Sequence, residues 1–461
     1  MKALLPNLDG NSHRPLYLQL YDYIKNAILT KEIVPGEKLP SLRNLSDALG
    51  VSLTTVDLAY SQLSVEGYIF SKPQSGYYIN HMYYPSDAKD SSSSSSSHFE
   101  ENYLLDKPSL FYDLECFDFA KWKKCINKVF VDYSHLLLFE SDPQGEEVLR
   151  YEISKYVFQS RGVKCRPEQI VIAAGTQQIT SHLSTILKRL DVNNVAVEEP
   201  GYLPVINIFA DRGFAISHVP VQKDGILIDK LPGNIKSAVY VNPSNQFPTG
   251  AVMPVAKRYQ LIDWAARNNS YIIEDDYDSE LRYFGKPVPS LQGLDTKNTV
   301  IYLGSFSSTL FSSIKISYMV LPEEMADIFA SIRGNYSQTC SKTEQLALAL
   351  FMKDGKYQTG IKKLRRLYSS KLHLVLHEFE SDSQDFIHPL NTSSGINMLL
   401  QVSSPKSPNK LSLEAKELGL NVIPGKSLTE GSASASMIFY YNQIPIDNIP
   451  LAIQRLIQKW K

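Results

Sequence analysis

Apolar residues in the first 70 positions recur at the spacing expected for α-helices. Between residues 16 and 28 they fall on one helical face. These residues are Leu16, Leu20, Tyr23, Ile24, Ala27 and Ile28. After a turn at residues 34–37, Ser41 is positioned to cap a second helix that ends at Gly50. Its expected apolar face consists of Leu42, Leu45, Ala48 and Leu49.

A third helix is predicted directly after the second, because Ser52 can cap its start and Gly67 can end it. Its apolar face is formed by Val56, Ala59, Tyr60 and Leu63. Two short runs at residues 68–71 and 77–80 then flank a turn and predict a β-hairpin. Three short helices and a hairpin form a winged helix-turn-helix pattern over residues 14–80, in which the third helix lies in a DNA major groove.

The polar stretch at residues 81–105 lacks hydrophobic periodicity and contains seven consecutive serines, Ser91–Ser97. Such a composition does not bury enough apolar surface to offset its ordering entropy, so it predicts a flexible linker. A random coil of roughly 22 residues spans about 25 Å on average, enough for the N-terminal module to reach a neighbouring subunit. The alternative is a surface loop within one domain.

Short apolar runs alternate with helical stretches over residues 106–461. The runs lie at residues 169–173, 194–197, 237–241, 271–274 and 300–303. Strands that are apolar on both faces and separated by helices predict a mostly parallel α/β sheet flanked by helices. Ligands in such sheets bind at the carboxyl ends of the strands, and polar residues follow several of these runs.

Composition limits the function classes further. The 461 residues are 43% hydrophobic, enough for two or three domains with a substantial core. The formal charge is −1, so any attraction to DNA must be local. The four cysteines are too far apart to indicate a disulfide framework or a metal site. No signal-like segment or run of about 18 apolar residues is present, which favours a cytoplasmic protein without a membrane segment.

The second and third helices resemble the GntR family of DNA-binding domains, and the similarity extends over residues 14–80. Residues 39–56 read LPSLRNLSDALGVSLTTV. The resemblance implies that the second helix, the start of the third helix and the hairpin contact a double-stranded DNA operator. The residues implied are Arg43, Ser52, Thr54, Thr55, Lys72 and Ser75.

This segment departs from the GntR pattern at three positions. Leu53 stands where the family usually has arginine, Asp57 adds an acidic side chain to the third helix, and Gln74 replaces a glycine of the hairpin. Residues 1–80 contain seven basic residues (Lys2, Arg14, Lys25, Lys31, Lys38, Arg43, Lys72) and seven acidic ones (Asp9, Asp22, Glu32, Glu37, Asp47, Asp57, Glu66). One module should therefore bind DNA weakly. A dimer would link two such modules and so raise the overall affinity for DNA. The alternative is a helical module used only for protein contacts.

Four motifs in the second half occur in the order found in fold-type I aminotransferases, and the similarity covers about 350 residues. They lie at residues 198–202 (EEPGY), 242–250 (NPSNQFPTG), 274–280 (EDDYDSE) and 301–322 (IYLGSFSSTLFSSIKISYMVLP). A GntR-like head, a linker and this domain together resemble the MocR/GabR group of bacterial transcription regulators. That resemblance implies a ligand-sensing domain, a small α+β C-terminal subdomain and a head-to-tail homodimer.

The resemblance also implies residues for pyridoxal phosphate, the cofactor of the aminotransferases. Those around its phosphate would be Gly175, Thr176, Gln177, Ser305 and Ser307. Tyr202 would stack on the pyridine ring, and Asp275 would pair with the ring nitrogen and make the ring an electron sink. Tyr277, with Asn245 or Gln246, would reach the ring hydroxyl. The alternative for Asp275 and Tyr277 is a strand-end network that serves folding.

Four departures affect this implied cofactor site. Ser308 stands where the family has the lysine that forms the Schiff base, and Lys315 replaces the arginine that clamps the phosphate. Phe139 replaces a tyrosine that would reach the phosphate across the dimer, and residues 431–437 lack a cation for a substrate carboxylate. Loss of such contacts lowers cofactor affinity, since one charged hydrogen bond contributes about 1.5–3 kcal/mol.

The sequence therefore favours a dimeric DNA-binding transcription regulator with a catalytically inactive aminotransferase-like domain and no metal site. Its effector is pyridoxal phosphate bound noncovalently, another small anion, or absent. A second hypothesis is a working aminotransferase that carries a DNA-binding head. A third treats the large domain purely as a dimerisation scaffold for the winged helices.

Overall fold

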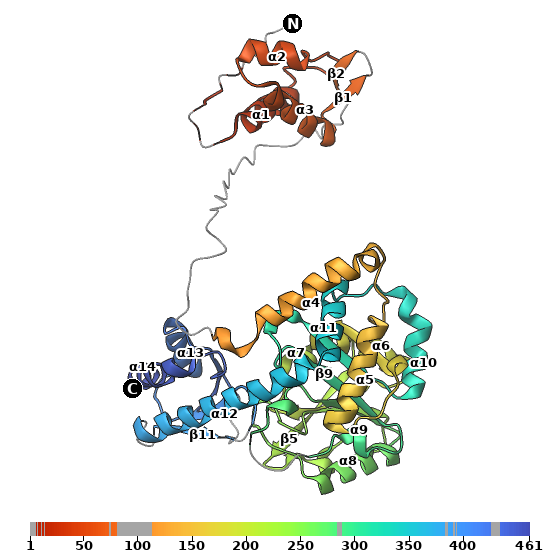
Figure 1. The fold of residues 1–461 in the computed structure, drawn as a ribbon, viewed down its shortest axis with the longest axis vertical. Helices are drawn as coiled ribbons and strands as arrows, with labels where there is room; N and C mark the ends of the chain where they lie inside the picture. The colour runs from red at the N-terminus through yellow and green to blue at the C-terminus, as the bar shows by residue number, and fades with distance from the viewer. Residues whose placement is uncertain are drawn as a thin grey trace. The chain divides into compact units, whose positions relative to one another are not determined.

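Internal contacts divide the chain into two compact units, Met1–Leu105 and Asp106–Lys461 (Figure 1). The structure is a computed structural model that describes residues 6, 8–10, 12, 14–72, 75–80, 113–283, 288–382, 386–390, 392, 394–425 and 434–461. The predicted linker at 81–105 and Gln74 lie outside these residues. Among the helices described, none is long and apolar enough to cross a membrane.

The smaller unit consists of three helices and a hairpin. The helices are α1 (Leu16–Leu29), α2 (Leu42–Leu49) and α3 (Leu53–Val65), and the strands are β1 (Ile69–Lys72) and β2 (Gly76–Ile79). Ser41 and Ser52 cap α2 and α3 by accepting hydrogen bonds from the backbone amides of Asn44 and Thr55. Strands β1 and β2 pair antiparallel with Ile69 opposite Ile79. The two serine caps fix where each helix begins.

Two residues predicted on the apolar helical faces are exposed instead. Tyr23 of α1 is 37% exposed, and Ala48 of α2 is also exposed. Successive residues of an α-helix are rotated by about 100°. Tyr23 and Ala48 each lie about that far around the helix from the centre of the buried face, so their side chains face solvent. Tyr21 and Ser46 are buried in their stead. The Tyr21 hydroxyl donates a hydrogen bond to Glu66, so its polar end is satisfied at the edge of the core.

The larger unit is built on an eight-stranded sheet in the order β3-β10-β9-β8-β7-β4-β5-β6. Six strands run parallel to one another, while β10 and β6 run antiparallel to their neighbours. The bounds are β3 (Ile170–Ala174), β4 (Asn194–Glu199), β5 (Ala215–Gln222), β6 (Gly225–Ile226), β7 (Ser237–Val241), β8 (Tyr271–Asp275), β9 (Val300–Ser305) and β10 (Ile316–Val320).

Helices cover both faces of this sheet. Apolar side chains alternate along β3, so that Val171 packs in one core cluster and Ile172 in another. The cluster with Val171 includes α6 (Gly175–Arg189), α7 (Leu203–Asp211) and α10 (Glu323–Ile332). The opposite face packs against α4 (Phe119–Asp132), α5 (Glu147–Arg161), α8 (Val255–Arg267), α9 (Leu291–Leu294) and α11 (Lys342–Lys353). Burial on both faces explains why the central strands are almost wholly apolar.

A small α+β subdomain follows the long helix α12 (Lys356–Asp382). Its antiparallel sheet has the order β11-β12-β14-β13, and its core includes Trp460. The elements are β11 (Ile387–Leu390), β12 (Met398–Val402), α13 (Pro408–Glu417), β13 (Val422–Pro424), β14 (Ala435–Phe439) and α14 (Ile449–Trp460). The predicted architecture, three helices and a hairpin followed by a mostly parallel α/β sheet and a small α+β C-terminal subdomain, is confirmed.

We expect Trp460→Ala to destabilise the larger unit by about 3–5 kcal/mol, the usual cost of removing a buried aromatic side chain. Trp460 is fully buried, and its Nε1 donates a hydrogen bond to the Leu411 carbonyl at 3.0 Å. Urea unfolding measures the change. Leu451→Ala in the same helix is the control, because Leu451 is 47% exposed and its truncation should cost about 0.5 kcal/mol or less. Equal effects of the two substitutions would contradict the prediction.

Candidate functional site

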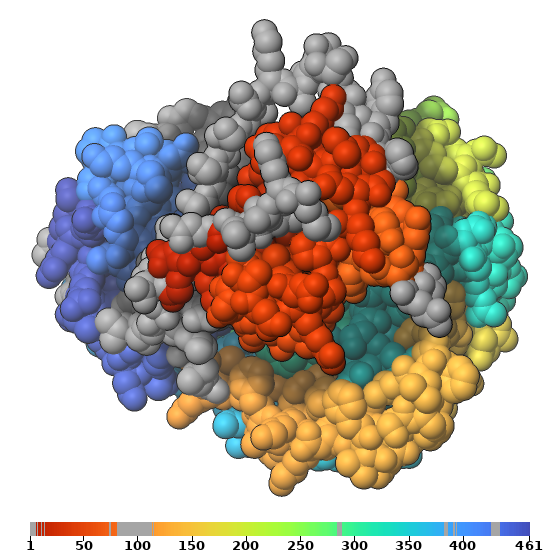
Figure 2. All heavy atoms as spheres, turned by 90° about the horizontal axis from the view of Figure 1, so that it is seen from above, coloured from red at the N-terminus to blue at the C-terminus, as the bar shows by residue number. Residues whose placement is uncertain are grey.

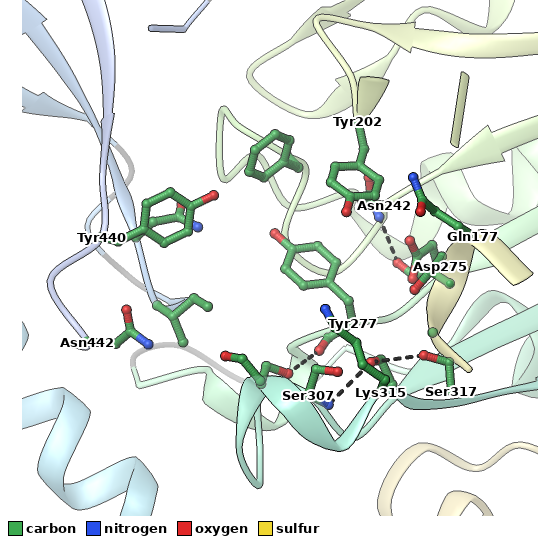
Figure 3. Close-up of a pocket in the computed structure, with 18 of the residues that line it drawn as sticks. Gln177, Tyr202, Asn242, Asp275, Tyr277, Ser307, Lys315, Ser317, Tyr440 and Asn442 are labelled. Atoms are coloured by element: carbon green, nitrogen blue, oxygen red, sulfur yellow. Dashed lines mark hydrogen bonds between the residues drawn. The ribbon is translucent and has the colours of Figure 1, made fainter. Parts of the chain in front are cut away.

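A cavity of about 660 Å³ opens where the strands β3, β8 and β9 end (Figure 3). One part of its wall comes from these strand ends and the loops after them. The other part comes from the small subdomain, which contributes Tyr440 and Asn442 across the cavity from Tyr202 and Tyr277. The carboxyl edge of the parallel strands is where the sequence places a ligand site.

Ten of the eleven residues that the sequence implies for the cofactor line this one cavity. They are Gly175, Thr176, Gln177, Tyr202, Asp275, Tyr277, Ser305, Ser307, Ser308 and Lys315. They come from five separate segments of the chain, so the fold gathers residues that are up to 140 positions apart (175 to 315). The exception is Asn245.

One end of the cavity is suited to an anion. Gly175 opens α6 with a φ of 80°, a left-handed conformation that glycine adopts without strain, and the free amides of the helix start there. Ser305 and Ser307 lie beside it, and Ser305 accepts a hydrogen bond from Ser317 at 3.1 Å. Lys315 is the single cation among the described residues that line the cavity. Amides, hydroxyls and one ammonium group form a cradle for a phosphate.

Two buried arginine–carboxylate pairs hold the end of β8. Glu274 and Arg258 are both fully buried, 3.5 Å apart, and Glu274 also accepts two backbone amide hydrogen bonds. Asp276 accepts from Arg161 at 2.7 Å and from the Tyr302 hydroxyl at 2.7 Å. Burial opposes ionisation of Asp276, but Arg161 and the hydrogen bonds outweigh it and hold its pKa below the usual range. The carboxylates on both sides of Asp275 are thus satisfied within the protein.

Asp275 itself faces the cavity and keeps one oxygen unpaired. It is 4% exposed, and the Tyr240 hydroxyl donates to its Oδ2. Its Oδ1 is buried without a hydrogen-bond partner among the described residues. Burial raises the pKa of Asp275 to about 6, although the Tyr240 hydrogen bond acts in the opposite direction. A buried, unpaired carboxylate oxygen is costly unless a ligand donates to it. The protonated nitrogen of a pyridine ring is a donor of the required kind.

Ser308 lies in the cavity wall at the position where the resemblance expects a lysine. Its hydroxyl donates a hydrogen bond to the Tyr277 carbonyl at 2.6 Å. The Tyr277 ring projects into the cavity near Tyr202 (Figure 3), and burial raises the pKa of its hydroxyl well above the usual value. Within the described wall, Lys315 at the anion end is the remaining amine. A hydroxyl engaged with the backbone offers no group for covalent capture of an aldehyde.

Asn245 and Gln246 are not among the residues that line this cavity. Asn245 donates to Asp278 at 2.6 Å and lies 3.4 Å from the Tyr277 hydroxyl, and Gln246 donates to the Pro200 carbonyl at 2.8 Å. Asn242 lines the cavity instead, because it is the first residue after β7 and therefore emerges at the carboxyl edge. The turn that follows carries Asn245 away from that edge.

Sequence reasoning missed the wall contributed by the small subdomain. Its residues are Ile396, Asn397, Asn421, Tyr440, Asn442 and Gln443. They are neutral and flank strands that pair only through distant contacts, so no local pattern singles them out. Phe247, Ser312 and Ser317 were missed as well, although each lies within or beside a motif that was recognised. Apart from Asp275 and Lys315, every residue in the described wall is uncharged.

The cavity wall is joined to the first residue described after the linker. Asp113 and Lys371 form a buried ion pair with side chains 5% and 0% exposed. Lys371 Nζ also donates to the Asn442 carbonyl at 2.7 Å, and the Asp113 amide donates to the Gln443 carbonyl at 3.0 Å. Burial lowers the pKa of Lys371, and Asp113 opposes that shift. Asp113 is thereby fixed to the backbone of two residues that line the cavity.

Phe139 lies outside the cavity and is 70% exposed. It belongs to a segment from α4 to α5 (gold in Figure 2) with further exposed large apolar side chains. These are Phe119, Phe130, Val131, Leu138, Val148, Tyr151 and Phe158. Of the cation-free stretch at 431–437, residues 431–433 lie outside the described chain. The four described residues of that stretch contribute no side chain to the cavity.

The smaller unit presents most of its implied DNA-binding residues at the surface. Arg43 and Thr54 are exposed, and the Ser52 and Thr55 hydroxyls lie 2.8 Å apart at the start of α3. The remaining two lie on the hairpin. Lys72 Nζ is 4.5 Å from the centre of the Tyr78 ring, and the Ser75 hydroxyl is 2.6 Å from the Tyr78 hydroxyl.

No group of three histidine, cysteine, aspartate or glutamate side chains in the described chain could hold a metal ion. The cavity combines an end suited to an anion, which contains Lys315, with the unpaired Asp275 oxygen. These groups would fit the phosphate and the ring nitrogen of pyridoxal phosphate. Residue 308 contributes a hydroxyl and no amine to the wall.

Comparison with known proteins matches both units to families. Residues 16–79 match the family described as bacterial regulatory proteins, gntR family, and residues 116–436 match aminotransferase class I and II. The chain is 37% identical to the uncharacterized HTH-type transcriptional regulator YdeL of Bacillus subtilis, over 99% of both chains. It is 32% identical to the HTH-type pyridoxine biosynthesis transcriptional regulator PdxR of Corynebacterium glutamicum, over 89% of both chains.

Among solved structures, an archaeal alanine:glyoxylate aminotransferase matches with a TM-score of 0.68 at 22% identity, covering 76% of this chain and 88% of that one. That likeness concerns the fold of the larger unit. Similarity to named transcriptional regulators extends over the whole chain, including the DNA-binding unit. The chain therefore belongs to the MocR-type transcription regulators, in which a gntR-family DNA-binding domain is fused to an aminotransferase class I and II domain.

Proposed function

We propose that this protein is a sequence-specific, homodimeric transcription regulator whose aminotransferase-like unit binds a phosphorylated small molecule without catalysing transamination. Pyridoxal phosphate, held noncovalently, is the leading candidate for that molecule. The main observation behind the proposal is that Ser308 lies in a cavity that is otherwise suited to bind a phosphorylated ring. The fold keeps the anion cradle and the unpaired Asp275 oxygen, but the wall has no amine at residue 308.

The chemistry of transamination explains why residue 308 decides between a sensor and an enzyme. When bound, pyridoxal phosphate supplies an aldehyde and an electron-withdrawing ring. An enzyme needs a lysine amine beside that aldehyde to hold the cofactor and to move a proton. Here the Ser308 hydroxyl donates to the Tyr277 carbonyl, and Lys315 lies at the phosphate end. The residues present can bind and orient the ring but cannot perform that proton transfer.

The uncharged outer wall favours a sensor as well. A working aminotransferase holds the substrate carboxylate with a cation, and Asn397, Asn421 and Asn442 offer only amides. The similarity to PdxR, which is named as a regulator of pyridoxine biosynthesis, favours a ligand of the pyridoxal class. We therefore assign Lys315, Ser305 and Ser307 to the ligand phosphate and Asp275 to its ring nitrogen.

The exposed apolar segment from α4 to α5 supports a homodimer. The resemblance to the MocR/GabR group implies a head-to-tail arrangement. Isolated soluble units rarely expose several large apolar side chains in one segment unless a partner covers them. Two copies would place two winged helix-turn-helix units on one DNA molecule. That arrangement compensates for the equal numbers of basic and acidic residues at positions 1–80, because the second unit then binds at a high effective concentration.

A different function, as a pure dimerisation scaffold, has one observation in its favour. Lys315 provides a point charge where a bidentate arginine would grip a phosphate more firmly. In that case no phosphorylated ligand stabilises the protein, and thermal unfolding stays unchanged over a wide ligand range. A sensor instead gains stability as RT ln(1 + [L]/Kd).

We expect pyridoxal phosphate to raise the unfolding temperature of the protein, and pyridoxal without the phosphate to raise it less. Lys315→Met and Asp275→Asn should each weaken the response, because they remove the phosphate cation and the ring-nitrogen partner. Lys342→Met, a substitution outside the cavity wall, is the control. Borohydride treatment followed by peptide mass analysis should find no cofactor on a cavity lysine. A fixed lysine adduct together with amino-acid turnover would establish the enzyme hypothesis instead.

We expect the full-length protein to retain particular duplex DNA fragments, and Arg43→Ala to bind them more weakly. If Arg43 contacts a phosphate, its loss makes the slope of log affinity against log salt less negative by about 1 per bound unit. Lys31→Gln is the matched control, since Lys31 lies at the end of α1 and outside the α2–α3 pair. Titrations at several salt concentrations measure both slopes. Equal slopes for Arg43→Ala and the unaltered protein would exclude a phosphate contact by Arg43.

A further inference from the structure

The recognition helix α3 has an apolar residue at the start of its exposed face. Leu53 is its first residue and is 47% exposed, although the helix already buries a complete apolar face in the core. That buried face consists of Val56, Ala59, Tyr60 and Leu63. Leu53 therefore contributes little to the fold of the unit and is available for a contact outside it.

The start of α3 is held firmly in place. Ser52 accepts a hydrogen bond from the Thr55 amide at 3.1 Å, and the two hydroxyls lie 2.8 Å apart. Both hydroxyls are thereby engaged with each other. Thr54 and Asp57 accompany Leu53 on the exposed side of the first turns. In a helix-turn-helix unit, the N-terminal residues of the second helix of the pair approach the base edges in the major groove.

The side chain of Leu53 restricts what it can recognise there. It neither donates nor accepts a hydrogen bond, so it gains nothing from the polar edges of guanine, cytosine or adenine. The thymine C5-methyl group is the apolar feature of the major groove. When leucine packs against that methyl group, two apolar groups are removed from water. When it packs against a polar base edge, the donors and acceptors of the base lose their hydrogen bonds to water.

We propose that Leu53 reads a thymine in each half-site of the operator by packing against its C5-methyl group. The proposal rests on the proposed sequence-specific DNA binding and names its specificity determinant. Balanced charge makes such a contact valuable, because residues 1–80 include seven basic and seven acidic residues and gain little from the phosphates alone. Asp57 adds to this, since a carboxylate near the groove opposes nonspecific approach to DNA.

A direct test removes the methyl group from the DNA and the leucine from the protein. Duplexes retained by the full-length protein are selected from a random library, and each thymine of the selected site is replaced in turn by uracil. We expect each half-site to contain one thymine whose replacement by uracil weakens binding about fourfold. This is the change in affinity that corresponds to the free energy of burying one methyl group. Leu53→Ala should bind thymine and uracil duplexes equally, since alanine does not extend as far.

Controls separate this contact from a general loss of binding. Alanine is a good helix former and Leu53 is exposed, so Leu53→Ala should unfold at the same temperature as the unaltered protein. Leu58→Ala, with a side chain equally exposed at 47%, should keep the discrimination between thymine and uracil. Leu53→Arg should shift the selected base from thymine to guanine, because arginine binds the guanine edge through two hydrogen bonds.

The outcomes distinguish this proposal from the function on which it rests. A protein that retains duplexes but shows no thymine sensitivity, or a Leu53→Ala variant that remains equally sensitive, overturns the assignment of Leu53. Failure to retain any duplex, even at low salt, overturns the proposed DNA-binding function instead. If Leu53→Ala changes the size of the protein assembly while leaving thymine discrimination intact, Leu53 belongs to a protein contact and the proposal is wrong.

Discussion

The larger unit depends on how three consecutive carboxyl groups at the end of β8 are satisfied. Arg258 and Arg161 neutralise Glu274 and Asp276 in the protein interior, where an unpaired charge would cost several kcal/mol. Asp275 between them receives one hydroxyl hydrogen bond and retains one bare oxygen. The central strand β8 thus ends in a carboxyl group whose second oxygen gains a hydrogen bond only if a ligand in the cavity donates one. The anion cradle and the tyrosines are arranged around that point.

Much of the structure follows from local patterns in the sequence. Serine caps at Ser41 and Ser52 and glycine ends predicted α2 and α3, because a cap is a contact between near neighbours. The strand ends near Ala174, Val241 and Asp275 were predicted because doubly buried strands are continuous apolar runs. The assignments of Tyr23 and Ala48 to buried faces were wrong, since the periodicity does not fix the width of a helical stripe to within one residue.

What the sequence did not predict depends on distant contacts. Asn397, Asn421 and Asn442 reach the cavity through a small sheet that pairs strands far apart along the chain, and a neutral amide in a loop carries no local signal. Neither Asn245 nor Gln246 lines the cavity, whereas Asn242, the first residue after β7, does. That residue 308 is a serine is plain from the sequence. That the Ser308 hydroxyl is bound to the Tyr277 carbonyl required the structure.

The buried pair of Lys371 and Asp113 fixes the first described residue of the larger unit to the wall of the cavity. Lys371 donates to the Asn442 carbonyl, and the Asp113 amide donates to the Gln443 carbonyl. Removing either side chain would leave the other as a buried, unpaired charge, which costs about 3–5 kcal/mol. The position of residues 442 and 443 in the cavity wall therefore depends on a residue that comes before the whole sheet in the sequence.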